Sequence, residues 1–324
     1  MCKQRNSTKL ALAFCVACFA SHKHLPHVKS TLTLAQKRTA MIKTRLIQII
    51  KPLVERFPSI AMAYRQVRDT RALVKEPQLT KLGFKFNGNE QMENGSFEPV
   101  ETSLVKQIFP KVDYVVNVGA NIGYYVCQAL QSKKKVFAFE PIETNIKYLL
   151  RNIKANNWQD NCEIFPVALS NKANIIEIFG GGTGASLIKG WAGTPERYST
   201  LVPCLTLNDI LGDRLNGKNI FVIVDIEGAE NMMLEGATKL LEMNPKPIWL
   251  VEISGAAHQP KGIKINPYIL KTFEKFWDRG YESITADNLR RKISKEEILK
   301  IIETQVDSLG THNFLFYEKN KNPF

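Results

Sequence analysis

The sequence predicts an α/β protein built on a doubly wound, mostly parallel β-sheet, and three observations favour this class. From Asp113 onward, short apolar runs alternate with segments of helical spacing, which is typical of βαβ units. Most of these runs are continuous, as expected of strands buried on both faces. The chain then finishes in two strand-like segments, YESITA and NFLFYEK, and we expect the last strand to run antiparallel.

The individual elements follow from the same patterns. The expected strands are YVVNVG (114–119), KVFAFEP (135–141), EIFPVALS (163–170), NIIEIFG (174–180), IFVIVDIEG (220–228), PIWLVEIS (247–254), YESITA (281–286) and NFLFYEK (313–319). The expected helices are 99–109, NIGYYVCQALQS (121–132), TNIKYLLRNIKANN (144–157), TLNDIL (206–211), AENMMLEGATKLLEM (229–243) and PYILKTFEKFWDRG (267–280), the last closed by its glycine.

Net charge does not by itself indicate a nucleic-acid-binding protein. The formal charge is +13, but residues 1–40 hold seven Lys or Arg and no Asp or Glu, which leaves +6 over the rest. We therefore expect a mildly basic surface and no nucleic-acid partner. The longest apolar run, LALAFCVACFA at 10–20, is shorter than the ~18 residues that a membrane-spanning helix needs.

We divide the chain into three parts. Residues 1–40 resemble a secretory signal peptide in their apolar run and a transit peptide in their lack of acids, and a non-native extension is the third interpretation. Residues 41–110 predict short basic helices and a hairpin that cap the core, although such helices can also contact a membrane, which we do not favour. Residues 111–324 form the predicted catalytic domain.

Cysteine and histidine usage does not predict a metal site. Cys127, Cys162 and Cys204 are dispersed, and no CxxC pair accompanies a second pair or a His pair. The HKHLPH segment at 22–27 is better explained as a solvated tail. We expect no metal, and we interpret the dispersed cysteines as reduced thiols of a cytoplasmic protein.

Residues suited to a nucleoside stand at the ends of the first two core strands, where ligands bind in parallel sheets. The first strand ends in GANIG (119–123), whose glycines let a ligand approach the backbone at the start of a helix. The second ends in Glu140, a carboxylate about 20 residues later that suits the two hydroxyls of a ribose. Each feature has a structural explanation on its own, but together they favour a nucleoside-containing ligand.

The loop sequence limits which nucleoside fits. A G-x-G-x-x-G dinucleotide fingerprint starting at Gly119 requires glycines where the chain has Asn121 and Tyr124. The GGGTGAS segment at 180–186 lacks the Lys of a phosphate-binding Walker loop, and we interpret it as a flexible loop that can border the substrate. A ligand with a ribose but no pyrophosphate, such as S-adenosylmethionine, fits these residues.

The stretches VVNVGANIGYY, VFAFEPIETNIKYLLRNIKANN, VDIEGAENMMLEGA and WLVEIS together resemble the FkbM family of S-adenosylmethionine-dependent methyltransferases. The resemblance covers roughly residues 84–255, and the DIEGAE block at 225–230 is its most specific motif. It implies a seven-stranded, mostly parallel class I methyltransferase (Rossmann-like) sheet with an antiparallel last strand, preceded by an N-terminal helical extension.

The resemblance also implies the site residues. Asp225, Glu227 and Glu252 stand at strand ends where the methyl group would be delivered, and one of them can accept a proton from an acceptor hydroxyl. Alternatively, Glu227 can cap the next helix and Asp225 can orient the cofactor. The residues assigned to the cofactor are Asn117, Gly119, Ala120, Asn121, Gly123, Glu140, Pro141, Glu101 and Ala168. We expect Glu98 and Glu101 at the pocket rim and His258 at the surface.

Three positions depart from the family pattern. Asn117 replaces the usual acid of the first motif, Ile223 replaces the usual Lys two residues before Asp225, and Asn208 replaces the acid of the TLD segment. These changes leave the implied fold intact and concern the contacts to substrate.

We therefore expect an S-adenosylmethionine-dependent methyltransferase that acts on a hydroxyl of a sugar, glycan or secondary metabolite. Methyl transfer from a sulfonium depends mainly on alignment, so it requires neither a strong nucleophile nor a metal. Two other classes stay open: an NAD-dependent oxidoreductase, and a catalytically degenerate scaffold that binds the nucleoside. The expected partner is a small-molecule or glycan acceptor, and the sequence does not indicate the oligomeric state.

Overall fold

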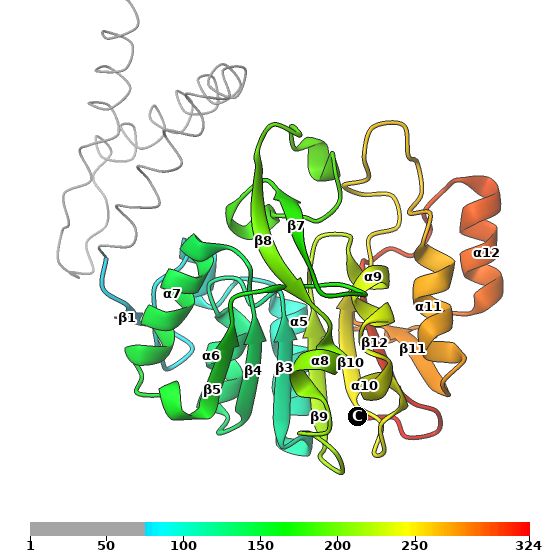
Figure 1. Cartoon of the computed structure of the whole chain (residues 1–324). Coiled ribbons are helices and arrows are strands. Elements are labelled where there is room, and N and C mark those ends of the chain that lie inside the picture. Colours follow the sequence, from blue (N-terminus) through cyan, green and yellow to red (C-terminus); the bar gives the residue numbers. More distant parts are fainter. Residues whose placement is uncertain (1–74) are drawn as a thin grey trace, which may run out of the picture. The chain divides into compact units, whose positions relative to one another are not determined.

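A seven-stranded β-sheet forms the centre of residues 75–324, the part of the chain that the computed structural model describes (Figure 1). The strand order across the sheet is β11–β12–β10–β9–β3–β4–β5. The strands are β3 (Tyr114–Val118), β4 (Lys135–Phe139), β5 (Cys162–Phe165), β9 (Ile220–Val224), β10 (Ile248–Glu252), β11 (Tyr281–Thr285) and β12 (Asn313–Glu318). The leader expected at 1–40 and the basic helices expected up to residue 74 lie outside the described residues.

The strand directions are those of the class I methyltransferase fold. The pairs β10–β9, β9–β3, β3–β4 and β4–β5 are parallel. β12, the last strand in the chain, lies between β10 and β11 and runs antiparallel to both. The expected mostly parallel sheet with an antiparallel last strand is therefore confirmed.

Helices cover both faces of the sheet because successive residues of each strand point to opposite sides. On β3, Val115 belongs to the buried cluster that also contains residues of α5 (Pro99–Ile108), α6 (Tyr124–Gln131) and α7 (Glu143–Lys154). Val116 points to the other face. The helices on that face are α8 (Leu207–Leu211), α9 (Glu230–Glu235), α10 (Thr238–Glu242), α11 (Ile269–Trp277) and α12 (Lys295–Thr304).

A second, three-stranded sheet projects beyond the main sheet (Figure 1). Its order is β6 (Ala168–Leu169), β8 (Ser199–Leu205), β7 (Asn174–Phe179). The strand expected over 163–170 is therefore wrong as a single element, because the chain passes from β5 to β6 at Pro166, which has no N–H for strand pairing. β8 was not expected, since Pro203 interrupts its apolar pattern.

Two further elements differ from or refine the expectation. The helix expected over 229–243 is two helices, α9 and α10, separated at Gly236. A Cβ at Gly236 would lie 2.1 Å from the carbonyl oxygen of Ser170, so the break brings backbone against backbone. The hairpin expected within residues 83–101 is displaced: its strands are β1 (Gln78–Leu79) and β2 (Lys85–Phe86), and α4 (Glu90–Asn94) lies where further turns were expected.

Candidate functional site

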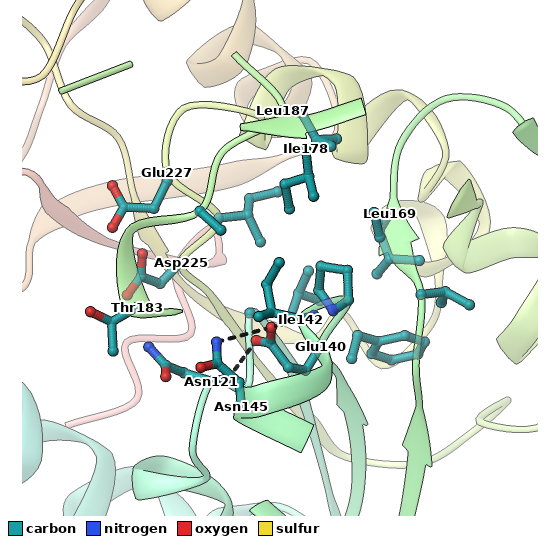
Figure 2. A pocket seen from close by; sticks show the side chains of 18 of the residues that line it. Asn121, Glu140, Ile142, Asn145, Leu169, Ile178, Thr183, Leu187, Asp225 and Glu227 are labelled. Atoms are coloured by element: carbon teal, nitrogen blue, oxygen red, sulfur yellow. Dashed lines mark hydrogen bonds between the residues drawn. The ribbon is translucent and has the colours of Figure 1, made fainter. Parts of the chain in front are cut away.

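A pocket opens at the carboxyl ends of β3, β4 and β9 (Figure 2). Its walls come from the loops that follow these strands, and the segment after β7 covers it with residues Gly182, Thr183, Ala185 and Leu187. β4 follows β3 in the chain on one side, whereas β9 comes much later on the other. The pocket thus lies where the strand order reverses, which is the usual ligand site of open α/β sheets.

Packing alone requires glycine at two positions of the loop after β3, whether or not a ligand binds there. Gly119 has φ +80°, and a Cβ there would lie 1.8 Å from the carbonyl oxygen of Asp225. Gly123 has φ +93°, and a Cβ there would lie 2.6 Å from the side chain of Leu149. Asn121 takes the left-handed conformation at φ 51°, and its Oδ1 accepts a hydrogen bond from the Ile122 N–H at 2.8 Å. Gly119 and Asn121 line the pocket.

Glu140, immediately after β4, is buried and held by three hydrogen bonds (Figure 2). Its Oε2 accepts from the Asn121 N–H at 2.8 Å, and its Oε1 accepts from the Ile142 N–H at 2.9 Å and from Asn145 Nδ2 at 3.1 Å. Burial raises the pKa of Glu140, and the three hydrogen bonds oppose this rise. The carboxylate is therefore fixed in one orientation at the pocket wall.

Sequence reasoning missed Asn145, which lies on α7 and is buried. Besides Glu140, its Nδ2 donates to the carbonyl oxygen of Gly182 at 3.0 Å, so it links the acidic residue to the segment that covers the pocket. Its position two residues into a helix carries no signal of this role, because the partners come from β4 and from the segment after β7.

The end of the pocket away from Asp225 and Glu227 is apolar (Figure 2). In Figure 2, Leu169 lies on the side away from Asp225 and Glu227. The apolar lining residues there and along the pocket are Val118, Phe139, Pro141, Ile142, Val167, Ala168, Leu169, Ile178, Ala185 and Leu187. The pocket thus offers an apolar wall, one oriented carboxylate and an acidic end.

At the acidic end two adjacent strand ends carry carboxyl groups, of which Asp225 lines the pocket and Glu252 lies outside the lining. Asp225 follows β9 and Glu252 ends β10, and the two carboxyl groups share a hydrogen bond. Burial and the neighbouring Glu252 raise the pKa of Asp225 well above its usual range. Burial raises the pKa of Glu252 to about 7, although the hydrogen bond from Asp225 lowers it. The two carboxyl groups therefore share one hydrogen bond in a buried place, and both bind protons more tightly than exposed carboxyl groups do.

Glu227 does not cap the following helix. Its carboxylate accepts from Trp191 Nε1 at 2.7 Å, and its carbonyl oxygen accepts from Ser186 Oγ at 2.5 Å. The loop is instead braced by Glu230, which is buried and accepts from the Gly228 N–H at 3.0 Å. Burial raises the pKa of Glu230 to about 8. Glu227 is thus left at the pocket, which it lines together with Asp225.

Several assigned residues lie outside the pocket lining. Asn117 is buried within β3, where its Nδ2 donates to the carbonyl oxygen of Ile223 at 3.4 Å. Ala120 is buried within the loop that follows β3. Glu101, on α5, accepts from Asn313 Nδ2 at 3.0 Å. His258 is exposed, as expected.

Glu98, expected at the rim, lies close to the acidic end. Its carboxylate accepts a hydrogen bond from the Tyr125 hydroxyl. Its charge also contributes to the raised pKa values of Asp225 and Glu252. Among residues 75–324, no group of three or more His, Cys, Asp or Glu is arranged to hold a metal. No helix of that region is long and apolar enough to span a membrane.

The methyltransferase FkbM domain matches residues 117–283, which is more than half of the chain and runs from β3 into β11. The chain belongs to the FkbM methyltransferase family. The matched range includes the loops that form the pocket and the acidic residues at the ends of β9 and β10. No curated protein sequence matches the chain.

Solved structures of methyltransferases are also similar to this FkbM-family chain. Methyltransferase FkbM from Methylobacillus flagellatus KT is 18% identical with a TM-score of 0.38, and the match covers 64% of this chain and 44% of that one. Precorrin-6y C5,15-methyltransferase from Geobacter metallireducens GS-15 is 10% identical (TM-score 0.37; 72% and 95% covered). A putative O-methyltransferase from Klebsiella pneumoniae is 6% identical (TM-score 0.37; 69% and 80% covered).

Proposed function

We propose that this protein transfers a methyl group from S-adenosylmethionine to a hydroxyl oxygen of a sugar, glycan or secondary metabolite. The observation that supports this most is the buried, pre-oriented Glu140, which stands between the apolar wall and the acidic end of the pocket. The groups of S-adenosylmethionine follow the same order along the molecule. Adenine binds through apolar contacts, the ribose hydroxyls bind a carboxylate, and the charged groups bind a polar end.

Each part of the pocket has a role in this proposal. Glu140 would hold the ribose, and Ile142 and Leu187 would contact the adenine. The backbone at Gly119 and Asn121 would border the methionine moiety. When bound, S-adenosylmethionine supplies an electrophilic methyl group on a positively charged sulfur. The acidic end of the pocket is complementary to that charge.

The acidic end also provides a base for the acceptor hydroxyl. Glu252 has a pKa raised to about 7, so a substantial fraction is ionised at neutral pH and remains basic enough to take a proton. Asp225 shares a hydrogen bond with Glu252, and this contact orients the Glu252 carboxyl group. We assign Glu252 as the proton acceptor and Asp225 as its positioning residue. An NAD-dependent oxidoreductase is not favoured, because the FkbM domain includes this pocket.

Labelled methyl transfer tests the proposal. Wild-type protein, incubated with methyl-labelled S-adenosylmethionine and fractionated cell extract, is expected to place label in an alkali-stable methyl ether. Glu252→Gln should lower the rate on the order of a hundredfold, the scale of general-base catalysis. Label found in an amine or an alkali-labile ester would contradict the hydroxyl acceptor. Complete absence of labelled product across the extract would support the degenerate scaffold instead.

A further inference from the structure

We infer that Trp191 is a positioning residue that fixes the carboxylate of Glu227 against the cofactor. The inference rests on the proposed function, because it assigns Glu227 to the end of the pocket that meets the positively charged sulfur. Trp191 does not line the pocket and is buried, so it acts through Glu227. Nothing in the sequence patterns marks this tryptophan, which lies between β7 and β8 in the chain.

The first line of evidence is the contact itself. Trp191 Nε1 donates to Glu227 Oε2 at 2.7 Å. A hydrogen bond from a buried indole to a carboxylate is of the strong, charge-assisted kind. It engages one carboxylate oxygen and leaves Oε1 available, on the side of the pocket where Figure 2 shows Glu227 next to Asp225.

The second line of evidence is the strained backbone below the indole. Glu227 has φ 55°, in the left-handed region that residues other than glycine rarely adopt. Such conformations persist where surrounding contacts over-determine them, and they gather at functional sites. Here Ser186 Oγ holds the carbonyl oxygen of Glu227 at 2.5 Å while Trp191 holds its side chain.

The third line of evidence is the fit between Trp191 and Gly228. A Cβ at Gly228 would lie 2.5 Å from the indole ring, so the ring rests directly on the backbone next to Glu227. On another side the indole meets the His258 ring edge to face, with 6.0 Å between the ring centroids, and the Ala192 N–H donates to the carbonyl oxygen of the same His258 at 2.7 Å. The indole therefore packs between the Gly228 backbone and the His258 ring.

The segment that carries Trp191 also reaches the ribose side of the pocket. Its residue Gly182 accepts from Asn145, the same amide that donates to Glu140. One segment thus contacts both carboxylates that we assign to the cofactor, Glu140 through Asn145 and Glu227 through Trp191. The segment between β7 and β8 therefore holds a residue in place at each end of the proposed cofactor site.

The test compares the charged cofactor with its uncharged product. Isothermal titration measures the affinities of Trp191→Phe for S-adenosylmethionine and S-adenosylhomocysteine, which differ by the methyl group and the positive charge. Phenylalanine keeps an aromatic ring and removes the N–H. We expect the affinity for S-adenosylmethionine to fall about tenfold and that for S-adenosylhomocysteine to change less than about twofold. Glu227→Gln should change the ratio similarly, and the double variant should show little further change.

Trp277→Phe is the matched control, because it removes an indole hydrogen bond of 2.9 Å, to Ser283 Oγ, away from the pocket lining. A wild-type affinity ratio in Trp191→Phe, or full additivity with Glu227→Gln, would overturn the inference while leaving the proposed function standing. If Trp191→Phe does not fold, a wild-type ratio in Glu227→Gln overturns it equally. A wild-type protein that binds neither ligand contradicts the proposed function itself.

Discussion

At the scale of single residues, two departures from the family pattern prove to be neighbours. Asn117 on β3 and Ile223 on β9 are register partners in the parallel sheet, and both are buried. The acid and the lysine that the family commonly carries at these positions would form an oppositely charged pair there. This chain replaces both members with neutral residues, so no buried charge is left without a partner. The two departures therefore lie side by side in the sheet, and Ile223 is not by itself a sign of a degenerate site.

Substitutions at this pair should be coupled. Ile223→Lys buries an unpaired charge and should lower the free energy of unfolding by about 3–5 kcal/mol. Adding Asn117→Asp should recover at least about 1 kcal/mol, because the two charges then pair. Urea denaturation measures both variants. Val222→Lys is the control, since Val222 points to the other face of β9 and Asn117→Asp should not rescue it. Equal rescue of both lysine variants would contradict the pairing.

Glu140 is the residue whose loss should affect cofactor binding most directly. Glu140→Ala removes the carboxylate proposed to hold the ribose, and we expect the affinity for S-adenosylmethionine to fall by about tenfold or more. Glu143→Ala provides the control, because Glu143 is exposed on α7 and pairs with Lys147. Isothermal titration compares the two variants with wild type. An unchanged affinity in Glu140→Ala would remove this residue from the site.

At the scale of elements, the sequence indicates the main strands but not the contacts of the segment between β7 and β8 that covers the pocket. Strands such as β3 and β9 are continuous apolar runs, and their ends can be read directly because glycine or acidic residues follow. The contact of Asn145 with Gly182 and that of Trp191 with Glu227 cannot be read in this way, because each joins residues 36 or more positions apart. Such pairings are set by how β7 and β8 fold back over the main sheet.

The fit between Trp191 and Gly228 can be tested by stability. Gly228→Ala should lower the free energy of unfolding by about 1–3 kcal/mol more than Gly217→Ala, because its Cβ would overlap the indole. Both glycines have positive φ, so both variants carry a similar backbone strain, but Gly217 has open space around it. Chemical denaturation measures the difference. Equal losses of stability in the two variants would show that the Trp191 indole moves aside without lowering the free energy of unfolding.

At the scale of the whole molecule, buried carboxyl groups gather near the carboxyl ends of β9 and β10. Asp225, Glu230 and Glu252 all have raised pKa values, with burial as the first cause in each case. An acid whose pKa is raised on folding binds more protons in the folded than in the unfolded state. Its contribution to stability is therefore greatest at low pH and is lost as pH rises through the folded value. The window here extends to about 7 for Glu252 and about 8 for Glu230.

These groups should make the cofactor-free protein less stable at pH 8 than at pH 5.5. Thermal unfolding at the two pH values measures the effect as a difference in Tm. Glu252→Gln should reduce that difference by a few degrees, because the glutamine cannot ionise. Glu303→Gln, at an exposed position on α12, should leave it unchanged. A difference in Tm that is the same in Glu252→Gln and wild type would contradict the assigned protonation of the cluster.

The global architecture is the level at which the sequence was most informative. Alternating strand and helix patterns, GANIG, Glu140 and DIEGAE were sufficient to predict the class I methyltransferase sheet. In the smaller sheet β7 was expected as a strand, but β8 and the separation of β6 from β5 were not predicted, because Pro203 and Pro166 interrupt the patterns that normally mark strands. The acidic end of the pocket is also hard to predict, since its residues come from four places: the start of α5, the ends of β9 and β10, and the segment between β7 and β8.

Binding of S-adenosylmethionine is the most direct test of the central proposal. Isothermal titration of the wild-type protein with S-adenosylmethionine and, separately, with NAD compares the proposed cofactor with that of the main rival class. We expect saturable binding of S-adenosylmethionine at one site and no binding of NAD. Binding of NAD without binding of S-adenosylmethionine would contradict the proposed function.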